Sequence, residues 1–230
     1  PKLPASLPKV TVCDELGNKQ DGLAEFDLTV QNPLLLAAQT VQGTYQIRYF
    51  TTQALANSNT NSIVNPTQFQ NTTTPQTIWV RIEDTAKPGS CARIMSFVIE
   101  VNAPLVLTQP LPIVLCDTDL PNDGSMEIDL TVREQQIFGG LPPFGAVVSY
   151  HRTLQDAENG FNNIADPKKF YNTVNPQTVY VAVVNQFGCR SVISLTVRVL
   201  PVPEPNMTPT PLELCDEGNG MAIFDLTKAE

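Results

Sequence analysis

The sequence is poor in the residues that mark nucleic-acid-binding and membrane proteins. Its 230 residues include only 14 lysines and arginines, against 23 aspartates and glutamates, and the formal net charge is -9. The cationic side chains are scattered along the chain, whereas phosphate binding depends on clustered ones, so we expect no nucleic-acid partner. No apolar run approaches the roughly 18 residues of a membrane-spanning helix, so we expect no membrane span in this segment.

The sequence also lacks the motifs of common enzyme classes. It has no phosphate-binding glycine loop, no nucleophile elbow and no Cys-x-x-Cys pair. The single histidine, His151, takes the place that Phe50 takes in an earlier, similar segment, and a lone histidine on a strand is more often structural than catalytic. The acidic pair Glu83-Asp84 is replaced by Val184-Asn185 in the later segment. We therefore predict that the chain is not an enzyme and has no catalytic residues.

A twelve-residue phrase occurs twice in the chain. FQNTTTPQTIWV (69–80) is followed 101 residues later by FYNTVNPQTVYV (170–181), with seven identical positions. Three Cys-Asp pairs, at 13–14, 116–117 and 215–216, are each followed by FDLT or IDLT. The pattern predicts a fragment of a tandem array. We assign repeat 1 to residues 1–103, repeat 2 to 104–202, and a linker with the truncated start of repeat 3 to 203–230.

Apolar and polar residues alternate with period two in both complete repeats. Ile78, Val80 and Ile82 share one face of a predicted strand, and the later set 179, 181 and 183 repeats them. Turn residues interrupt the pattern about every ten positions, as in a sandwich of short strands. The pattern predicts an all-β fold of tandem immunoglobulin-like β-sandwich domains. Thr131 and Glu134 have the spacing of a capping box and predict a short helical turn, which we expect to differ in repeat 1 because of Asn32-Pro33.

The five cysteines occupy ordered positions. Each complete repeat has an entrance cysteine, Cys13 or Cys116, and a turn cysteine after a glycine-containing turn near its end, Cys91 or Cys189. Two per repeat indicate one disulfide per domain and an extracytoplasmic location, with buried free thiols in the cytosol as the alternative. In an immunoglobulin-like sandwich the chain enters at the pole that carries the last turn. We therefore predict the pairs Cys13–Cys91 and Cys116–Cys189, with Cys215 free.

Two further features are candidate binding sites. CDTDLPNDG offers the oxygen atoms of Asp117, Asp119, Asn122 and Asp123, which predict a calcium site in repeat 2, with turn-forming hydrogen bonds as the alternative. Calcium is the only cofactor that we expect. Trp79 and Tyr180 stand at equivalent outward positions and could stack on a sugar ring; the alternative is that they cover a linker or a neighbouring strand.

Proline-rich segments, APLVLTQPLP (103–112) and LPVPEPNMTPTP (200–211), separate the repeats. Proline favours extended geometry, so we expect stiff joints and a beads-on-a-rod arrangement with little contact between domains.

The order CD, then FDLT, then TPQTIWV or NPQTVYV, then a turn with Gly and Cys, then a proline-rich joint resembles a known repeat. It is similar to the repeats of the large SprB-like adhesins of gliding Bacteroidetes, and the resemblance covers almost the whole chain. It implies type IX secretion and display on the outer cell surface. It also implies adhesion to a substratum or polysaccharide, with motility machinery engaged by other parts of the parent protein. The alternative function is a carbohydrate-binding module array of a secreted polysaccharide-degrading protein, and a glycan array would discriminate the two.

Overall fold

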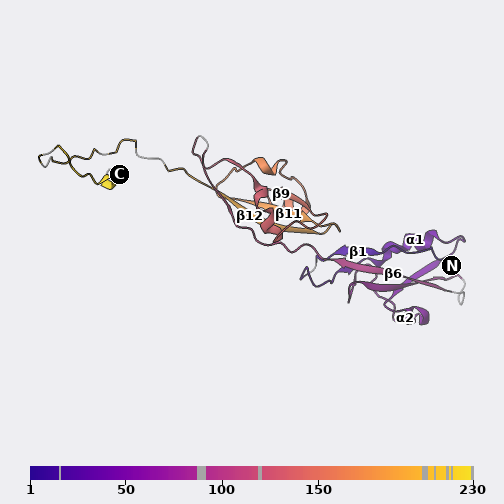
Figure 1. The fold of residues 1–230 in the computed structure, drawn as a ribbon. Helices are drawn as coiled ribbons and strands as arrows, with labels where there is room; N and C mark the ends of the chain where they lie inside the picture. Colours follow the sequence, from indigo (N-terminus) through magenta and orange to yellow (C-terminus); the bar gives the residue numbers. More distant parts are fainter. Residues whose placement is uncertain are drawn as a thin grey trace.

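The computed structural model shows one β-rich domain for each complete repeat (Figure 1). The structure describes residues 1–15, 17–86, 92–118, 121–203, 207–209, 211–215, 218 and 220–228. In Figure 1 the two domains follow one another, and the chain after residue 203 leads away from repeat 2. Among the described residues, no helix combines the length and the apolar character needed to cross a membrane.

Repeat 1 consists of a four-stranded sheet, a two-stranded sheet and short helices. The four-stranded sheet has the order β1-β6-β5-β3, in which β5 is antiparallel to both neighbours and β1 is parallel to β6; β2 and β4 form the second sheet. Its elements are β1 (Val10–Cys13), β2 (Glu25–Phe26), the 3-10 helix η1 (Leu28–Gln31), α1 (Asn32–Ala37), β3 (Tyr45–Phe50), α2 (Gln53–Ser58), β4 (Phe69–Gln70), β5 (Gln76–Asp84) and β6 (Arg93–Asn102).

Repeat 2 has the same topology, with sheet order β7-β12-β11-β9 and the pair β8–β10. Its elements are β7 (Ile113–Cys116), β8 (Glu127–Ile128), η2 (Leu130–Arg133), α3 (Glu134–Phe138), β9 (Val147–His151), α4 (Leu154–Asn159), η3 (Pro167–Lys169), β10 (Phe170–Tyr171), β11 (Gln177–Val184) and β12 (Arg190–Leu200). A last 3-10 helix, η4 (Leu226–Lys228), follows in the start of repeat 3.

The core of each repeat lies where the period-two pattern places it. Ile78, Val80 and Ile82 of β5 are completely buried, and so are the three matching valines of β11 at 179, 181 and 183. They pack against the layer that includes β2 and β4 in repeat 1, and β8 and β10 in repeat 2. Full burial of each such side chain contributes roughly 1.5 to 3 kcal/mol. The prediction of tandem immunoglobulin-like β-sandwich domains is confirmed.

The helical turn after IDLT is present, but its cap differs from the predicted one. Asp129 is the N-cap, and its Oδ1 accepts hydrogen bonds from the backbone N (2.8 Å) and the Oγ1 (2.6 Å) of Thr131. Glu134 does not reach back to Thr131; its Oε1 accepts a hydrogen bond from the Tyr150 hydroxyl at 2.9 Å. Burial, with this hydrogen bond second, raises the pKa of Tyr150 far above its ordinary value.

Repeat 1 forms the same turn, so the expected difference is wrong. Asp27 caps η1 in the way that Asp129 caps η2. The Tyr49 hydroxyl donates to Asn32 Oδ1 at 2.5 Å, in place of the bond to a glutamate. Pro33 lies at the start of α1, where a missing backbone N–H costs nothing, and the proline therefore does not change the fold.

The proline-rich segment 103–112 is not a free spacer. Thr108 N donates to the Ile137 carbonyl at 2.8 Å, and Gln109 Nε2 donates to the Ser194 carbonyl at 2.9 Å. Leu105 and Leu107 pack against the core of repeat 2. Most of the segment is therefore part of repeat 2, and the chain passes from one domain to the next near residues 103–105. The matching segment 1–9 packs on repeat 1 through Leu3 and Leu7.

Candidate functional site: the junction between the repeats

A disulfide joins the two repeats. It links Cys13, the last residue of β1, to Cys189, which directly precedes β12. The two Cα atoms are 5.4 Å apart, within the range that a disulfide requires. Cys189 is completely buried. The bridge spans 176 residues of sequence and fixes the end of the first strand of repeat 1 to the last turn of repeat 2.

This bond shows that the predicted pairing of Cys13 with Cys91 and of Cys116 with Cys189 is wrong. Cys116 lies opposite Leu200 at the end of β12, whereas Cys189 lies at its start. Eleven strand residues separate the two poles by roughly 35 Å, too far for a bridge. The prediction placed each entrance cysteine at the pole of the last turn, but β1 and β7 run parallel to the last strand and end at the opposite pole. Cys91 lies outside the described residues, and Cys116 and Cys215 are exposed free thiols.

Side chains from both repeats hold the short crossing segment beside the bridge. Gln20 Nε2 of repeat 1 donates to the Pro104 carbonyl at 2.9 Å. From repeat 2, Asn185 Nδ2 donates to the Ala103 carbonyl at 3.0 Å and Ser191 Oγ to the Leu105 carbonyl at 2.6 Å. Each repeat thus pairs carbonyl groups of the crossing segment, which fixes the segment between them.

The loop after the entrance cysteine is held by a buried carboxylate. In repeat 1 the Asp14 backbone N donates to the Asn102 carbonyl at 3.0 Å, and Asp14 Oδ2 accepts from Gly22 N at 2.9 Å. In repeat 2 the same two bonds join Asp117 to the Leu200 carbonyl (2.7 Å) and to Gly124 N (2.6 Å). The recurring Cys-Asp pair therefore ties the entrance cysteine of each repeat to the end of its last strand.

The twelve-residue phrase completes this network through a buried asparagine. Asn71 Oδ1 accepts from Ala24 N at 2.7 Å, and its Nδ2 donates to the carbonyls of Gly22 (2.8 Å) and Thr73 (3.0 Å). Asn172 repeats all three bonds, with Met126, Gly124 and Val174. The glutamine of the phrase, Gln76 or Gln177, accepts from the backbone four residues earlier at 2.8 Å in both repeats. The phrase recurs because it forms a loop lock, which we define as the Asp14–Gly22–Asn71 bonds and their repeat 2 equivalents.

A cleft of about 400 Å³ opens beside the bridge between the two repeats. Repeat 1 contributes Glu15 and Lys19 to its wall, and repeat 2 contributes Glu158 and Arg190. Arg190 is held in place, since its Nη1 donates to the Ala157 carbonyl of α4 at 3.1 Å. The wall carries charges of both signs, so it does not select a ligand of one charge.

The predicted calcium ligands that the structure describes make hydrogen bonds within repeat 2. Asp117 is buried in the loop lock, Asp123 Oδ1 accepts from Ser125 N at 2.9 Å, and Asn122 Nδ2 donates to the Val202 carbonyl at 3.2 Å. Asp119 lies outside the described residues. In the described part of the chain no group of three or more His, Cys, Asp or Glu side chains could hold a metal ion. Calcium binding stays a prediction, which a melting curve with calcium and with chelator would test.

The predicted sugar-stacking aromatics are half-buried. Trp79 lies opposite Phe50 in the sheet of repeat 1, and Tyr180 lies opposite His151 in that of repeat 2. This sheet face carries α2 in repeat 1 and α4 in repeat 2, so neither ring stands alone in solvent. Sugar binding by these residues stays a prediction.

His151 is a buried structural residue in the described geometry. Its Nδ1 lies 2.7 Å from the Phe161 carbonyl, which can only accept, so Nδ1 carries the proton. Its Nε2 lies 2.9 Å from Ser149 Oγ. Both ring nitrogens are therefore satisfied inside the domain, as the structural interpretation of this histidine requires.

Three solved structures illustrate what this chain is similar to in fold. Human protocadherin-24 EC1-2 is 11% identical with a TM-score of 0.28, and the match covers 88% of this chain and 99% of that chain. Sidekick-1 immunoglobulin domains 1–4 are 8% identical with a TM-score of 0.22, covering 90% of this chain and 47% of that chain. The Bacteroides ovatus protein SGBP-B, solved with a mixed-linkage heptasaccharide, is 8% identical with a TM-score of 0.22, covering 86% and 45%.

A comparison with curated proteins gives no match to this chain. A family model, in contrast, matches both repeats, over residues 9–105 and 112–203. Its description names a bond of the kind found between Cys13 and Cys189. With more than half of its length matched and its two domains joined by a disulfide, the chain belongs to the Flavobacterium inter-domain disulphide bond domain family.

Proposed function

We propose that the chain is a non-enzymatic segment of an extracellular filament that supports surface attachment and gliding, as SprB-like adhesins do. The observation that carries the proposal is the offset bridge, which joins neighbouring repeats instead of closing each repeat on itself. An inter-domain disulfide persists in an oxidising, extracytoplasmic environment and makes consecutive domains a single covalent unit. A structural filament needs such a unit, whereas an independent binding module does not.

The second repeat supports the same interpretation. Cys116 has the strand register and backbone bond of Cys13, since each entrance cysteine lies opposite the last residue of the last strand and is followed by an aspartate bonded to that residue. The Cys116 thiol is exposed. It therefore stands ready to receive the turn cysteine of a following repeat, as Cys13 receives Cys189. The start of such a repeat is present in the sequence at Cys215 and FDLT (224–227).

The side chains that the repeats share have structural roles. The residues of the loop lock pair backbone groups of the domain, and the shared apolar residues form its core. Features that differ between the repeats, such as His151, occur once. This division supports a structural array over a catalytic protein.

Antibody labelling of intact cells tests the proposal. An antibody raised against the 230-residue chain is expected to label unpermeabilised cells, and its Fab fragments are expected to reduce attachment to glass. Labelling that requires permeabilised cells would overturn the extracellular filament. Surface labelling with unchanged attachment, together with binding to a defined glycan on an array, would favour the carbohydrate-binding alternative.

A further inference from the structure

The Cys13–Cys189 bond creates a short covalent path through the two repeats. From residue 1 to residue 203 the path follows residues 1–13, crosses the bond, and continues along residues 189–203. It leaves out residues 14–188, which include β2 to β11 and most of both cores. Any tension between the two ends of the molecule reaches this path once the path is taut.

The path has little slack because it is extended in the folded protein. Its described parts are β1, β12 and connecting segments that contain no helix. It contains 28 residues, which span at most roughly 90 to 100 Å at 3.3 to 3.6 Å per residue. Strand residues already rise by about 3.3 Å each, close to the limit of an extended chain, so pulling lengthens them little.

A second path of the same kind runs beside the first. It follows β6, the extended segment 103–112 and β7, and ends at Cys116. The two paths lie next to each other in both repeats, because β1 pairs in parallel with β6, and β7 pairs in parallel with β12. Parallel pairing makes both paths run in the same direction along the array. We call these two paths the rails.

We propose that the first rail bears the tension on this chain, that the second rail bears tension in an array where Cys116 is bonded to a following repeat, and that the bodies of the repeats, residues 14–90 and 117–188, do not. The proposal rests on the filament function proposed above and gives it a mechanism. Tension enters and leaves β12 through its own two ends, at Cys189 and Leu200, and does not separate β12 from β7 or β11. The repeat bodies connect the two rails and stay folded under load.

Single-molecule force spectroscopy on the full chain, held by its two ends, tests the proposal. In the oxidised protein only residues 1–13 and 189–230 lie on the covalent path, so the extension is expected to stop at roughly 180 to 200 Å. Addition of a reductant to the held molecule is expected to release residues 14–188, a gain of roughly 580 to 630 Å. Reduction in place avoids any dependence on a variant that fails to fold.

Variants sharpen the result. Cys13→Ser is expected to release the full length without reductant, and the matched control Cys116→Ser is expected to behave as the unmodified protein does, because Cys116 forms no disulfide in this chain. Oxidised molecules that release the full length would overturn the rail proposal even if the protein lies on the cell surface. A protein that passes the force test but is not exposed on cells would instead overturn the filament function and leave the rails intact.

Discussion

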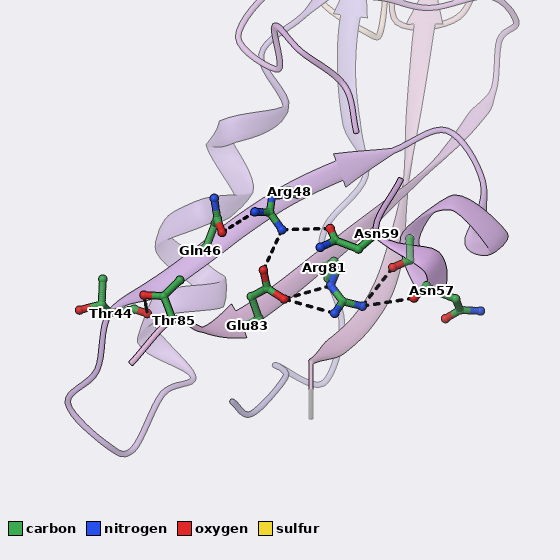
Figure 2. Close-up of polar contacts among 9 residues, drawn as sticks. Thr44, Gln46, Arg48, Asn57, Asn59, Arg81, Glu83 and Thr85 are labelled. Atoms are coloured by element: carbon green, nitrogen blue, oxygen red, sulfur yellow. Dashed lines mark hydrogen bonds and ion pairs between the residues drawn. The ribbon is translucent and has the colours of Figure 1, made fainter. Parts of the chain in front are cut away.

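Repeat 1 and repeat 2 share their loop locks but differ on the sheet face that carries α2 and α4. In repeat 1 this face holds an ionic network: Glu83 accepts from Arg48 Nη1 at 2.7 Å and from Arg81 Nη2 at 3.2 Å (Figure 2). Ser149, Ala182 and Val184 occupy the equivalent positions of repeat 2. The ionic network is therefore dispensable for the fold, whereas the loop lock is present in both repeats.

The hydrogen bond that holds the helix on this face also differs between the repeats. The last turn of an α-helix leaves carbonyl groups without partners. In repeat 1, Arg81 of β5 donates to the Ala56 carbonyl of α2 at 3.2 Å, and Figure 2 shows it beside Asn57 of the same helix. In repeat 2, Arg190 of β12 donates to the Ala157 carbonyl of α4 at 3.1 Å. An arginine side chain therefore donates to a last-turn carbonyl of each helix, but it comes from β5 in repeat 1 and from β12 in repeat 2. A ligand site repeated along the array would need the same side chains in each copy, and this face does not provide them.

The largest expected difference in stability is between serine substitutions at the two entrance cysteines. Cys13→Ser should lower the free energy of unfolding by about 2 to 5 kcal/mol, because it removes a cross-link that closes a very long loop. Cys116→Ser, at the equivalent position, should leave it unchanged. Urea denaturation without reductant measures both. Equal effects of the two substitutions would contradict the bridge described here.

The loop lock should respond equally in the two repeats. Asn71→Ala and Asn172→Ala each leave one buried N–H and two carbonyl groups without hydrogen-bond partners. Each substitution should therefore destabilise its own repeat by about 3 kcal/mol. Hydrogen exchange resolves the two repeats separately. Asn57→Ala, on the exposed side of α2, is the matched control and should change stability by less than about 0.5 kcal/mol. A large loss of stability in one repeat only would show that the equivalent hydrogen bonds do not have the same role in both repeats.

The residue that ends the helix should distinguish the repeats. Gly160 ends α4 with φ of 74°, and an added Cβ would lie 2.5 Å from Arg190 Nη2. Gly160→Ala should therefore displace that arginine and cost about 1 to 2 kcal/mol. Asn59 ends α2 with φ of 55°, and its Oδ1 accepts only an exposed hydrogen bond from Arg48 Nη1 at 3.0 Å, so Asn59→Gly should be close to neutral. Thermal melting of the two variants measures the contrast, and a neutral Gly160→Ala would show that the arginine relocates without loss.

The smallest expected effect is a pH dependence confined to repeat 2. Hydrogen bonds from Thr153 and Asn162 lower the pKa of Asp156, whereas Leu55 occupies the equivalent position in repeat 1. A carboxyl with a lowered pKa in the folded state stabilises the fold above its unfolded pKa, near 4, and loses that contribution as the pH falls through the folded value. The protection of α4 amides, relative to their intrinsic exchange rates, should therefore fall below pH 4, while that of α2 amides should not. Asp156→Asn should abolish the difference, and its persistence would assign the effect to another group.

The fold was predictable because its signals are local or repeated. Alternation in β5 and β11 places Ile78 and Val179 in the core, and the recurrence of Cys-Asp defines the two domains. The pairing of Cys13 was not predictable in the same way. It depends on whether β1 runs parallel or antiparallel to β6, and a four-residue apolar strand has the same pattern in either direction.

The loop lock and the junction contacts depend on partners far apart in the sequence. Asn71 pairs with residues 47 and 49 positions earlier, and Gln20 pairs with a carbonyl 84 positions later. Only the identical recurrence of the asparagine and glutamine in both copies signalled Asn71 and Gln76. Gln20, Asn185 and Ser191 carry no such signal.

The offset of the bridge by one repeat has a consequence for the way such a gene can change its copy number. Cys13 and Cys116 are equivalent positions, and so are Cys91 and Cys189. Recombination between two copies at equivalent codons would therefore join an entrance cysteine to a correctly spaced turn cysteine in the next copy, whatever the number of copies in between. The array can lengthen or shorten by whole repeats without leaving an unpaired cysteine in its interior. Selection on length is thus separated from selection on disulfide pairing.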